Sequence, residues 1–309
     1  MRYKLYKMSF QTAVHFGNGT LESGDFVFCA DTLFSALCQE ACKRDVAFME
    51  ELCNYVHENQ LRFSDAFPYI GDTYYLPKPM RKIVKDREAS DSVLKKAYKK
   101  LKYIPVEEFD DYLRGEYDVL RARGMMELGS CEVKTATAIR GKEETEPYRI
   151  GQYYFYDGNG LYFIVGYECD DAVRLVEELL EYLTYSGIGG KRSSGYGRFE
   201  LRIKKVPEGL VRRLNVESTM YMSLSVSLPQ EDELRTALSE AEYTLCKRSG
   251  FVASEKYAKE QMRKKDLYVF KSGACFKTKF NGDIYNVACK EGKHAVYRYA
   301  KPLFMGVDV

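Results

Sequence analysis

A glycine-rich run at residues 187–197 constrains the fold of this chain more than any other feature. The run reads GIGGKRSSGYG and holds five glycines in eleven positions. It follows an apolar segment of helical period at residues 172–183 and precedes a strand-like segment at residues 199–206. Closely spaced glycines allow a sharply bent backbone, so the sequence predicts a helix, a tight loop and a strand in that order.

The residues inside this run indicate an anionic ligand. Lys191, Arg192 and the following Arg198 supply positive charge, and glycine N–H groups can approach a phosphate closely. A Walker A loop is excluded because Arg192 stands where Ser or Thr is needed, and neither G-x-G pair has the third glycine of a dinucleotide fingerprint. The remaining interpretations are a loop that contacts phosphates and an ordinary flexible loop.

The first half of the chain predicts a βαββαβ unit that carries an insertion. The helix and strand that flank the glycine run supply its last two elements. The earlier elements are expected to be a strand at 3–16, a helix from an Asp31 N-cap to about residue 57, a loop at 61–79, a hairpin of strands at 133–140 and 150–155, and a strand at 161–166.

The second half predicts another unit of the same kind, beginning after Pro207. Asn281 and Gly282 form a dipeptide typical of a two-residue hairpin turn. The expected elements are strands at 220–228, 267–270, 275–280, 284–288 and 296–307 and a helix at 231–241. The fold class predicted is therefore α+β, with two similar domains in tandem at 1–206 and 207–309 and an inserted segment at about 80–156.

Composition excludes several classes of protein. The 309 residues are 45% hydrophobic and 30% charged, which is typical of a water-soluble globular chain. No uninterrupted apolar run is long enough to span a membrane. Nine scattered cysteines and three histidines form no zinc-ligand pattern, so we expect no metal or other cofactor. Free thiols without a secretion signal indicate the cytoplasm.

Positive charge is concentrated in one segment of a nearly neutral chain. The formal net charge is only +2, but residues 78–102 contain ten Lys or Arg against three Asp or Glu, a local charge of +7. Acidic residues elsewhere compensate for it. This distribution favours local contact with a nucleic acid, and a solvated helix face is the alternative for the lysines at 95–102.

The glycine-rich run resembles the signature of the RAMP superfamily of CRISPR RNA-binding proteins. The stretches ADTLFSAL at 30–37, FPYIGDTYYLPKP at 67–79 and VYRYAK at 296–301 extend the similarity. In their order and spacing they are similar to the family that caps the 5′ end of the CRISPR RNA (crRNA) in type III-A effectors, the fourth subunit of the Csm complex.

The resemblance implies a fold, a function and a set of partners. The two domains would be ferredoxin-like (RRM-like), and the inserted hairpin would be the thumb with which RAMP subunits interrupt the guide–target duplex. The chain would bind the repeat-derived 5′ handle of the crRNA without catalysis. It would join a large polymerase-like subunit to the adjacent backbone RAMP subunit and contact target RNA through the guide duplex, with no membrane partner.

The residues expected to contact RNA come from the glycine run, the first helix, a proline-bounded loop, the hairpin and the C-terminal half. They are His15, Thr32, Ser35, Pro77, Lys78, Pro79, Arg140, Gly189, Gly190, Lys191, Arg192, Ser193, Ser194, Gly195, Tyr196, Lys247, Arg248 and Arg298.

A metal-independent endoribonuclease that cleaves CRISPR repeat RNA is the alternative function. His15 would be its general base, provided that a 2′-hydroxyl lies within reach. A histidine that hydrogen-bonds RNA or the protein core is the simpler interpretation of His15. Asp25, between Gly24 and Phe26, is interpreted as a carboxylate in a turn. The resemblance favours a subunit without a catalytic residue.

Overall fold

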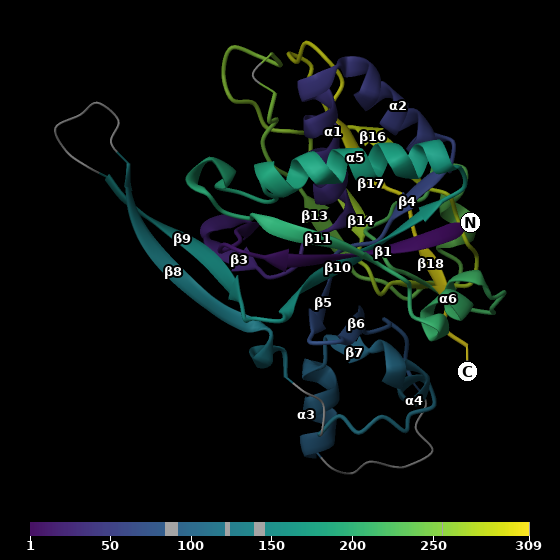
Figure 1. Ribbon diagram of the computed structural model, residues 1–309. Helices are drawn as coiled ribbons and strands as arrows, with labels where there is room; N and C mark the ends of the chain where they lie inside the picture. The colour runs from purple at the N-terminus through teal and green to yellow at the C-terminus, as the bar shows by residue number, and fades with distance from the viewer. Residues whose placement is uncertain (84–91, 121–123, 139–145, 255, 309) are drawn as a thin grey trace.

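A seven-stranded sheet forms the centre of the molecule in the computed structural model, which describes residues 1–83, 92–120, 124–138, 146–254 and 256–308. Its order is β11-β1-β10-β5-β6-β7, and β4 also pairs with β10 (Figure 1). The strands are β1 (Arg2–Phe10), β4 (Leu61–Phe63), β5 (Phe67–Ile70), β6 (Thr73–Pro77), β7 (Tyr103–Pro105), β10 (Asn159–Tyr167) and β11 (Phe199–Lys204).

Side chains alternate between two cores across this sheet. In β10, Phe163 and Val165 face one core, whereas Tyr162 and Ile164 face the other. A strand buried on both faces requires an almost continuous apolar sequence, and residues 161–165 read LYFIV. The predicted strands at 161–166 and 199–206 are confirmed with small shifts in their ends.

Three helices cover one face of the sheet: α1 (Ala30–Arg44), α2 (Val46–His57) and α5 (Asp170–Ser186) (Figure 1). The prediction for residues 172–183 is confirmed by α5. The single helix predicted up to residue 57 is wrong, because the chain breaks at Asp45, whose carboxylate accepts a hydrogen bond from the Ala47 amide at 3.0 Å and caps α2.

Two further predictions for the first half are wrong. Asp31 is not the N-cap of α1: Cys29 holds that position, and Asp31 is a buried residue of the first helical turn. Residues 61–79 are not a loop, because β4, β5 and β6 occupy most of that range. The prolines and tyrosines suggested a loop, but backbone pairing of β5 with β10 and β6 overrides that local preference.

The inserted segment contains the predicted hairpin, which is longer than expected. Strands β8 (Gly129–Ala138) and β9 (Glu146–Phe155) pair from Gly129 opposite Phe155 to Ala138 opposite Glu146. The hairpin projects from the body of the molecule (Figure 1). Arg140 lies outside the described residues.

Two short helices of the insertion, α3 (Ser92–Lys100) and α4 (Phe109–Leu113), and the single 3₁₀ turn η1 (Val106–Glu108) pack on the face of the sheet opposite α1, α2 and α5. A second 3₁₀ turn, η2 (Met125–Glu127), packs through Met125 against the same core as those three helices. α6 (Glu208–Asn215) joins α3 and α4 against the second core (Figure 1).

In the part of the C-terminal half that the structure describes, the strands do not form one continuous sheet. They form one three-stranded sheet, β15-β12-β18, and two pairs, β13-β14 and β16-β17. The bounds are β12 (Tyr221–Ser223), β13 (Leu245–Arg248), β14 (Leu267–Phe270), β15 (Cys275–Phe276), β16 (Asp283–Asn286), β17 (Tyr297–Ala300) and β18 (Phe304–Gly306), with helix α7 (Leu234–Ala237).

Three expectations for this half are corrected. The Asn281–Gly282 hairpin is wrong, because β15 pairs with β12 while β16 pairs with β17. The helix expected at 231–241 is reduced to α7, and the strand expected at 296–307 is divided into β17 and β18. β14 agrees with the strand predicted at 267–270, and β16 covers residues 284–286 of the strand predicted at 284–288.

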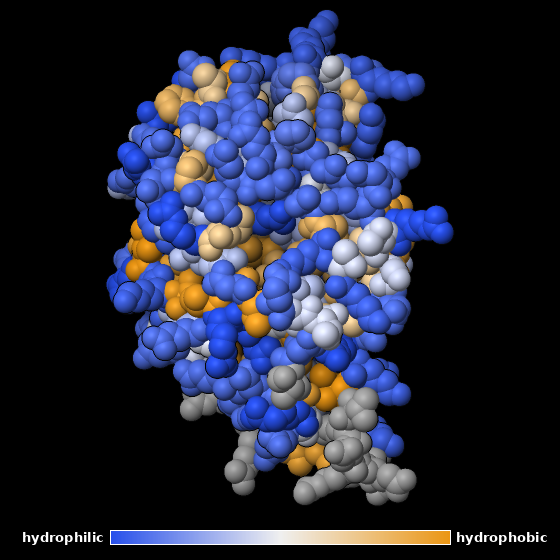
Figure 2. All heavy atoms as spheres, turned by 90° about the vertical axis from the view of Figure 1, so that its right-hand side faces the viewer, coloured by the Kyte–Doolittle hydropathy of each residue, from blue (hydrophilic) through white to orange (hydrophobic). Residues whose placement is uncertain are grey.

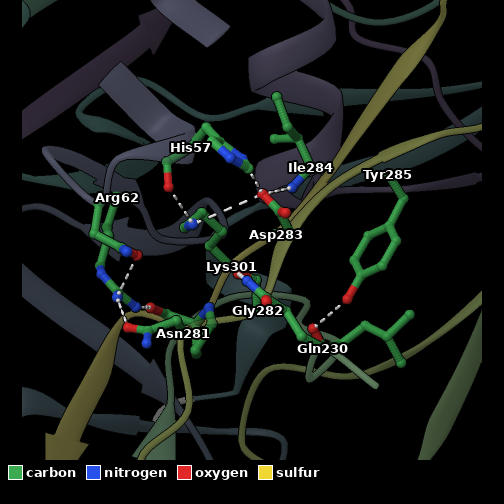
Figure 3. A network of polar contacts seen from close by, with 12 residues as sticks. His57, Arg62, Gln230, Asn281, Gly282, Asp283, Ile284, Tyr285 and Lys301 are labelled. Atoms are coloured by element: carbon green, nitrogen blue, oxygen red, sulfur yellow. Dashed lines mark hydrogen bonds and ion pairs between the residues drawn. The ribbon is translucent and has the colours of Figure 1, made fainter. Parts of the chain in front are cut away.

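A polar network joins the C-terminal half to α2 and β4 (Figure 3). The Lys301 ammonium donates to the His57 carbonyl at 3.2 Å and lies 3.9 Å from the Asp283 carboxylate. Arg62 donates to the Asn281 side chain at 2.9 Å and to the Pro302 carbonyl at 2.7 Å. The two halves are therefore held together by buried polar contacts as well as by shared core side chains.

Polar side chains cover most of the face shown in Figure 2, with apolar side chains gathered in patches near its middle. Within the described ranges, no helix is long and apolar enough to cross a membrane.

Candidate nucleic-acid interface

A cleft of about 310 Å³ lies between α1, the glycine-rich loop and the C-terminal half. Eight of the residues predicted to contact RNA line it, although they come from distant parts of the chain. These eight are His15, Thr32, Ser35, Gly189, Gly190, Arg192, Arg248 and Arg298.

The glycine-rich loop closes one side of the cleft by packing against His15. The Gly190 amide donates to the His15 carbonyl at 2.8 Å. A Cβ at Gly189 would lie 2.9 Å from that carbonyl oxygen, and a Cβ at Gly190 would lie 2.7 Å from the imidazole Cδ2. Gly189 is therefore required for the loop to approach the His15 backbone, and Gly190 for it to approach the His15 ring, whatever ligand the loop contacts.

Glycine is also required near the end of the loop, at Gly195 and Gly197, for two different reasons. Gly197 has a φ of +76°, and a Cβ there would lie 2.0 Å from the Ile188 carbonyl oxygen. Gly195, with a φ of +84°, has nothing within 4 Å of its Cβ position. Only the left-handed backbone requires glycine at 195, whereas sterics require it at 197.

His15 holds the loop to the hairpin. Its Nδ1 lies 2.6 Å from the Gly151 carbonyl oxygen in β9, and that oxygen can only accept, so Nδ1 carries the proton. The side chain is only 6% exposed. One residue thus connects the glycine loop to the base of the hairpin.

Asp31 organises the arginines on the opposite side of the cleft. Arg248 Nε and Nη2 donate to its two carboxylate oxygens at 2.9 and 2.7 Å, and Arg298 Nη1 donates at 2.5 Å. Burial alone would raise the pKa of Asp31, but the two guanidinium groups outweigh burial and hold that pKa below its usual value. The same contacts fix both arginines in place.

Hydroxyl groups from the first turns of α1 also face the cleft. Thr32 Oγ1 accepts from Arg248 Nη2 at 3.2 Å, and Ser35 Oγ accepts from the Gln39 side chain at 3.5 Å.

Asp65 binds the start of α1. The Ala30 amide at the helix start donates to the Asp65 carboxylate at 2.8 Å, and the Val226 amide donates to the same oxygen at 3.0 Å. Asp65 therefore ties the helix start to the C-terminal half.

Two further cations line the cleft. Arg192 donates to the Gln39 side chain at 2.6 Å, and its guanidinium lies 3.8 Å from the Glu40 carboxylate. Lys264 approaches from the C-terminal half. Its pKa is lowered, first by burial and then by the neighbouring Arg298.

Other residues of the predicted set lie outside the cleft lining, and among them Lys191 and Tyr196 contact the hairpin. The Lys191 ammonium lies 4.6 Å from the centre of the Tyr148 ring, and the Tyr196 hydroxyl donates to the Gln152 side chain at 2.7 Å. The described members outside the lining are Pro77, Lys78, Pro79, Lys191, Ser193, Ser194, Gly195, Tyr196 and Lys247.

Two of these positions are engaged in contacts of their own. Lys247 pairs with Asp266 at 2.7 Å, so it points differently from its neighbour Arg248, as alternation along a strand requires. Lys78 donates to the Tyr98 carbonyl in α3 at 2.6 Å.

Sequence reasoning missed Asp65 and Lys264 and assigned Asp31 a different role. Asp65 lay in an expected loop, and burial raises its pKa to about 6. An acidic residue within the apolar stretch FSDAF was the available signal. No sequence signal links Asp31 to arginines more than 200 positions away.

Among the described residues, no group of three or more His, Cys, Asp or Glu is placed to bind a metal ion.

The fold and the glycine-closed cleft define the class of protein. Residues 7–200 match the family model of the RAMP superfamily. Residues 216–307 match the model of the CRISPR Csm4 C-terminal domain. The chain therefore belongs to the Csm4 family of the RAMP superfamily, as the sequence resemblance predicted.

Full-length relatives support this assignment. The protein named "CRISPR system Cms protein Csm4" from Mycobacterium tuberculosis strain H37Rv is 38% identical over 311 residues, which cover 99% of this chain and 98% of the relative. The Streptococcus thermophilus protein of the same name is 38% identical over 318 residues and is covered completely, as is this chain.

Solved structures share the fold. The crystal structure of a Csm3-Csm4 subcomplex in the type III-A CRISPR-Cas interference complex aligns with a TM-score of 0.68 at 18% identity, covering 99% of both chains. A Csm1-Csm4 cassette in complex with cA4 aligns with a TM-score of 0.62 at 19% identity, covering 100% of this chain and 99% of that one.

Proposed function

We propose that this chain is the non-catalytic subunit of a type III-A CRISPR interference complex that holds the 5′ repeat-derived handle of the crRNA in the cytoplasm. The cleft that gathers eight predicted RNA-contacting residues is the observation that carries this proposal. Membership of the Csm4 family supports the assignment to that complex.

The chemistry of the cleft suits a single-stranded RNA. Arg192 and Lys264 offer positive charge, Thr32 and Ser35 offer hydroxyl groups, and phosphate contacts dominate RNA affinity. Arg298 is only 6% exposed, and within the described residues its Nε has no hydrogen-bond partner. A bound acceptor would satisfy that group.

The proposed domain organisation has a ferredoxin-like first domain at 1–206 and a second RRM-like domain at 207–309. The order β1, α1, β4, β10, α5, β11 supports the first, with β11-β1-β10-β4 as neighbours in the sheet. For the second, the support is limited to its α+β composition. In this proposal the hairpin β8–β9 is a thumb that reaches the guide–target duplex, and Arg140, between the two strands in sequence, is among the residues that contact RNA.

The proposed protein partners are the large polymerase-like subunit and the neighbouring backbone RAMP subunit. Their support is the likeness to Csm4 chains solved together with Csm1 and with Csm3. Contact with target RNA would be made through the guide duplex.

The arrangement around His15 favours RNA binding over repeat cleavage. A general base must reach a 2′-hydroxyl, and His15 is buried, with only 6% of the residue exposed. We infer that His15 positions the glycine loop. Incubation of the purified chain with repeat RNA checks this inference, since cleavage that His15→Ala abolishes would assign it the catalytic role.

The handle-binding proposal is tested by removing the cleft cations. We expect the variant Arg192→Gln/Lys264→Gln to bind a short RNA carrying the handle less tightly, because two phosphate contacts are lost. The slope of log affinity against log salt should flatten by about 1.4, at about 0.7 per contact. Fluorescence anisotropy over a salt series measures both quantities.

The matched control is Lys290→Gln/Lys293→Gln, which removes the same charge from exposed positions outside the cleft lining. It should retain the affinity and the slope of the unmodified protein. Equal loss in both variants would show that the cleft has no special role in handle binding and would refute the proposal.

A further inference from the structure

The helix α3 presents a cationic face that is separate from the cleft. Lys95, Lys96, Lys99 and Lys100 are all exposed, and the helix sequence contains no acidic residue. On a helix of 3.6 residues per turn, the four lysines fall within an arc of about 140°. The helix is therefore cationic along one side only.

The opposite side of α3 is fixed to the protein. Leu94, Tyr98 and Leu101 pack against the core on that face of the sheet. The Lys78 ammonium donates to the Tyr98 carbonyl at 2.6 Å near the end of the helix. This anchoring directs the four lysines to solvent and holds their spacing.

Like charges lie close together on this face of α3. The pairs Lys95–Lys99 and Lys96–Lys100 are four residues apart, a spacing at which like charges destabilise a helix. In the described ranges of the chain, no carboxylate forms an ion pair with any of the four. An external anion would relieve the repulsion.

We propose that this face of α3 binds the phosphate backbone of single-stranded RNA without regard to sequence. α3 lies on the side of the sheet opposite α1, α2 and α5, so it forms a second site apart from the cleft (Figure 1). Lysine is depleted from protein–protein interfaces, whereas lysine–phosphate contacts supply most sequence-independent RNA affinity. The inference does not depend on handle binding by the cleft.

The test uses the full-length chain and a poly(U) RNA, which lacks any handle sequence. The variant Lys95→Gln/Lys96→Gln/Lys99→Gln/Lys100→Gln keeps residues of good helix propensity. If three of the lysines contact phosphates, the salt dependence of log affinity should flatten by about 2, and affinity at low salt should fall by roughly tenfold or more. Circular dichroism verifies that the variant is folded.

The control Lys204→Gln/Lys205→Gln/Lys290→Gln/Lys293→Gln removes four exposed lysines elsewhere and produces the same change in net charge. Its salt slope should match that of the unmodified chain. An equal slope in the α3 variant and the unmodified chain would overturn the proposal, as would equal flattening in both variants.

A second measurement needs no substitution. Acetylation of the unmodified chain, followed by mass spectrometry, should show that poly(U) protects the four lysines of α3 and leaves Lys290 reactive. Protection of α3 by partner subunits in the absence of RNA would assign this face to a protein contact and overturn the proposal.

Discussion

At the scale of single residues, Asp31 has the largest structural consequence in the cleft. It is buried and binds two arginines from the other half of the chain. Replacing it with asparagine leaves two guanidinium groups without their counter-charge, so we expect Asp31→Asn to lower the free energy of unfolding by about 3–5 kcal/mol at neutral pH. Urea denaturation of the two proteins measures the difference.

The pH dependence of that difference follows from the depressed pKa of Asp31. The folded protein retains the carboxylate below the pH at which the unfolded chain protonates it, so the stabilisation is complete above about pH 4 and lost at lower pH. Asp266→Asn, at an exposed ion pair with Lys247, should cost less than about 1 kcal/mol. Equal effects of the two substitutions would contradict the central role assigned to Asp31.

At the scale of elements, the glycine-rich loop provides the clearest prediction. Gly197→Ala places a methyl group 2.0 Å from the Ile188 carbonyl oxygen at a φ of +76°. We expect it to destabilise the protein by more than about 3 kcal/mol, because the backbone must move to relieve the overlap. Gly195→Ala meets no atom within 4 Å and should cost only the left-handed conformation, about 1–2 kcal/mol.

Thermal denaturation of both loop variants provides the measurement. A larger loss of stability for Gly195→Ala than for Gly197→Ala would contradict the close approach of Gly197 to the Ile188 carbonyl as the contact that closes the loop.

Elements with a strong periodic signal were predictable from the sequence, and elements defined by distant pairing were not. α5, β10 and β11 have local hydrophobic patterns that decide their structure. The break at Asp45 was missed because the apolar stripe continues through it. β5 was missed because its pairing with β10, about 90 positions away, outweighs its local turn residues.

At the scale of the whole molecule, the sequence identified the residues of the cleft better than the way in which they meet. The glycines and basic residues of the glycine-rich run indicated contact with phosphates, and eight of the residues predicted to contact RNA line the cleft. The network of Asp31, Arg248 and Arg298 depends on how the two halves pack, which no local pattern encodes. The C-terminal half was predicted least well, because its strands are short and three of them, β12, β15 and β18, pair with strands that are not their neighbours in sequence.

The buried ammonium of Lys301, at the junction of the two halves, makes the stability of the protein depend on pH. Lys301 is 0% exposed, and burial lowers its pKa to about 8. The nearby Arg62 also lowers this pKa, whereas the carboxylates of Asp283 and Glu233 raise it. The unfolded chain keeps this proton until about pH 10.5, so it binds more protons than the folded protein between these values. Stability should therefore rise with pH, by about 2 kcal/mol from about pH 7 to about pH 9.5.

Lys301→Met removes this titration and should reduce the rise by about 2 kcal/mol, while exposed Lys290→Met should leave it unchanged. Urea denaturation of the three proteins at both pH values isolates the contribution of Lys301, because other titrating groups are common to all. Since Lys301 contacts the His57 carbonyl at the end of α2, an equal rise in Lys301→Met and the unmodified protein would mean that the junction of the halves does not exclude water from this ammonium.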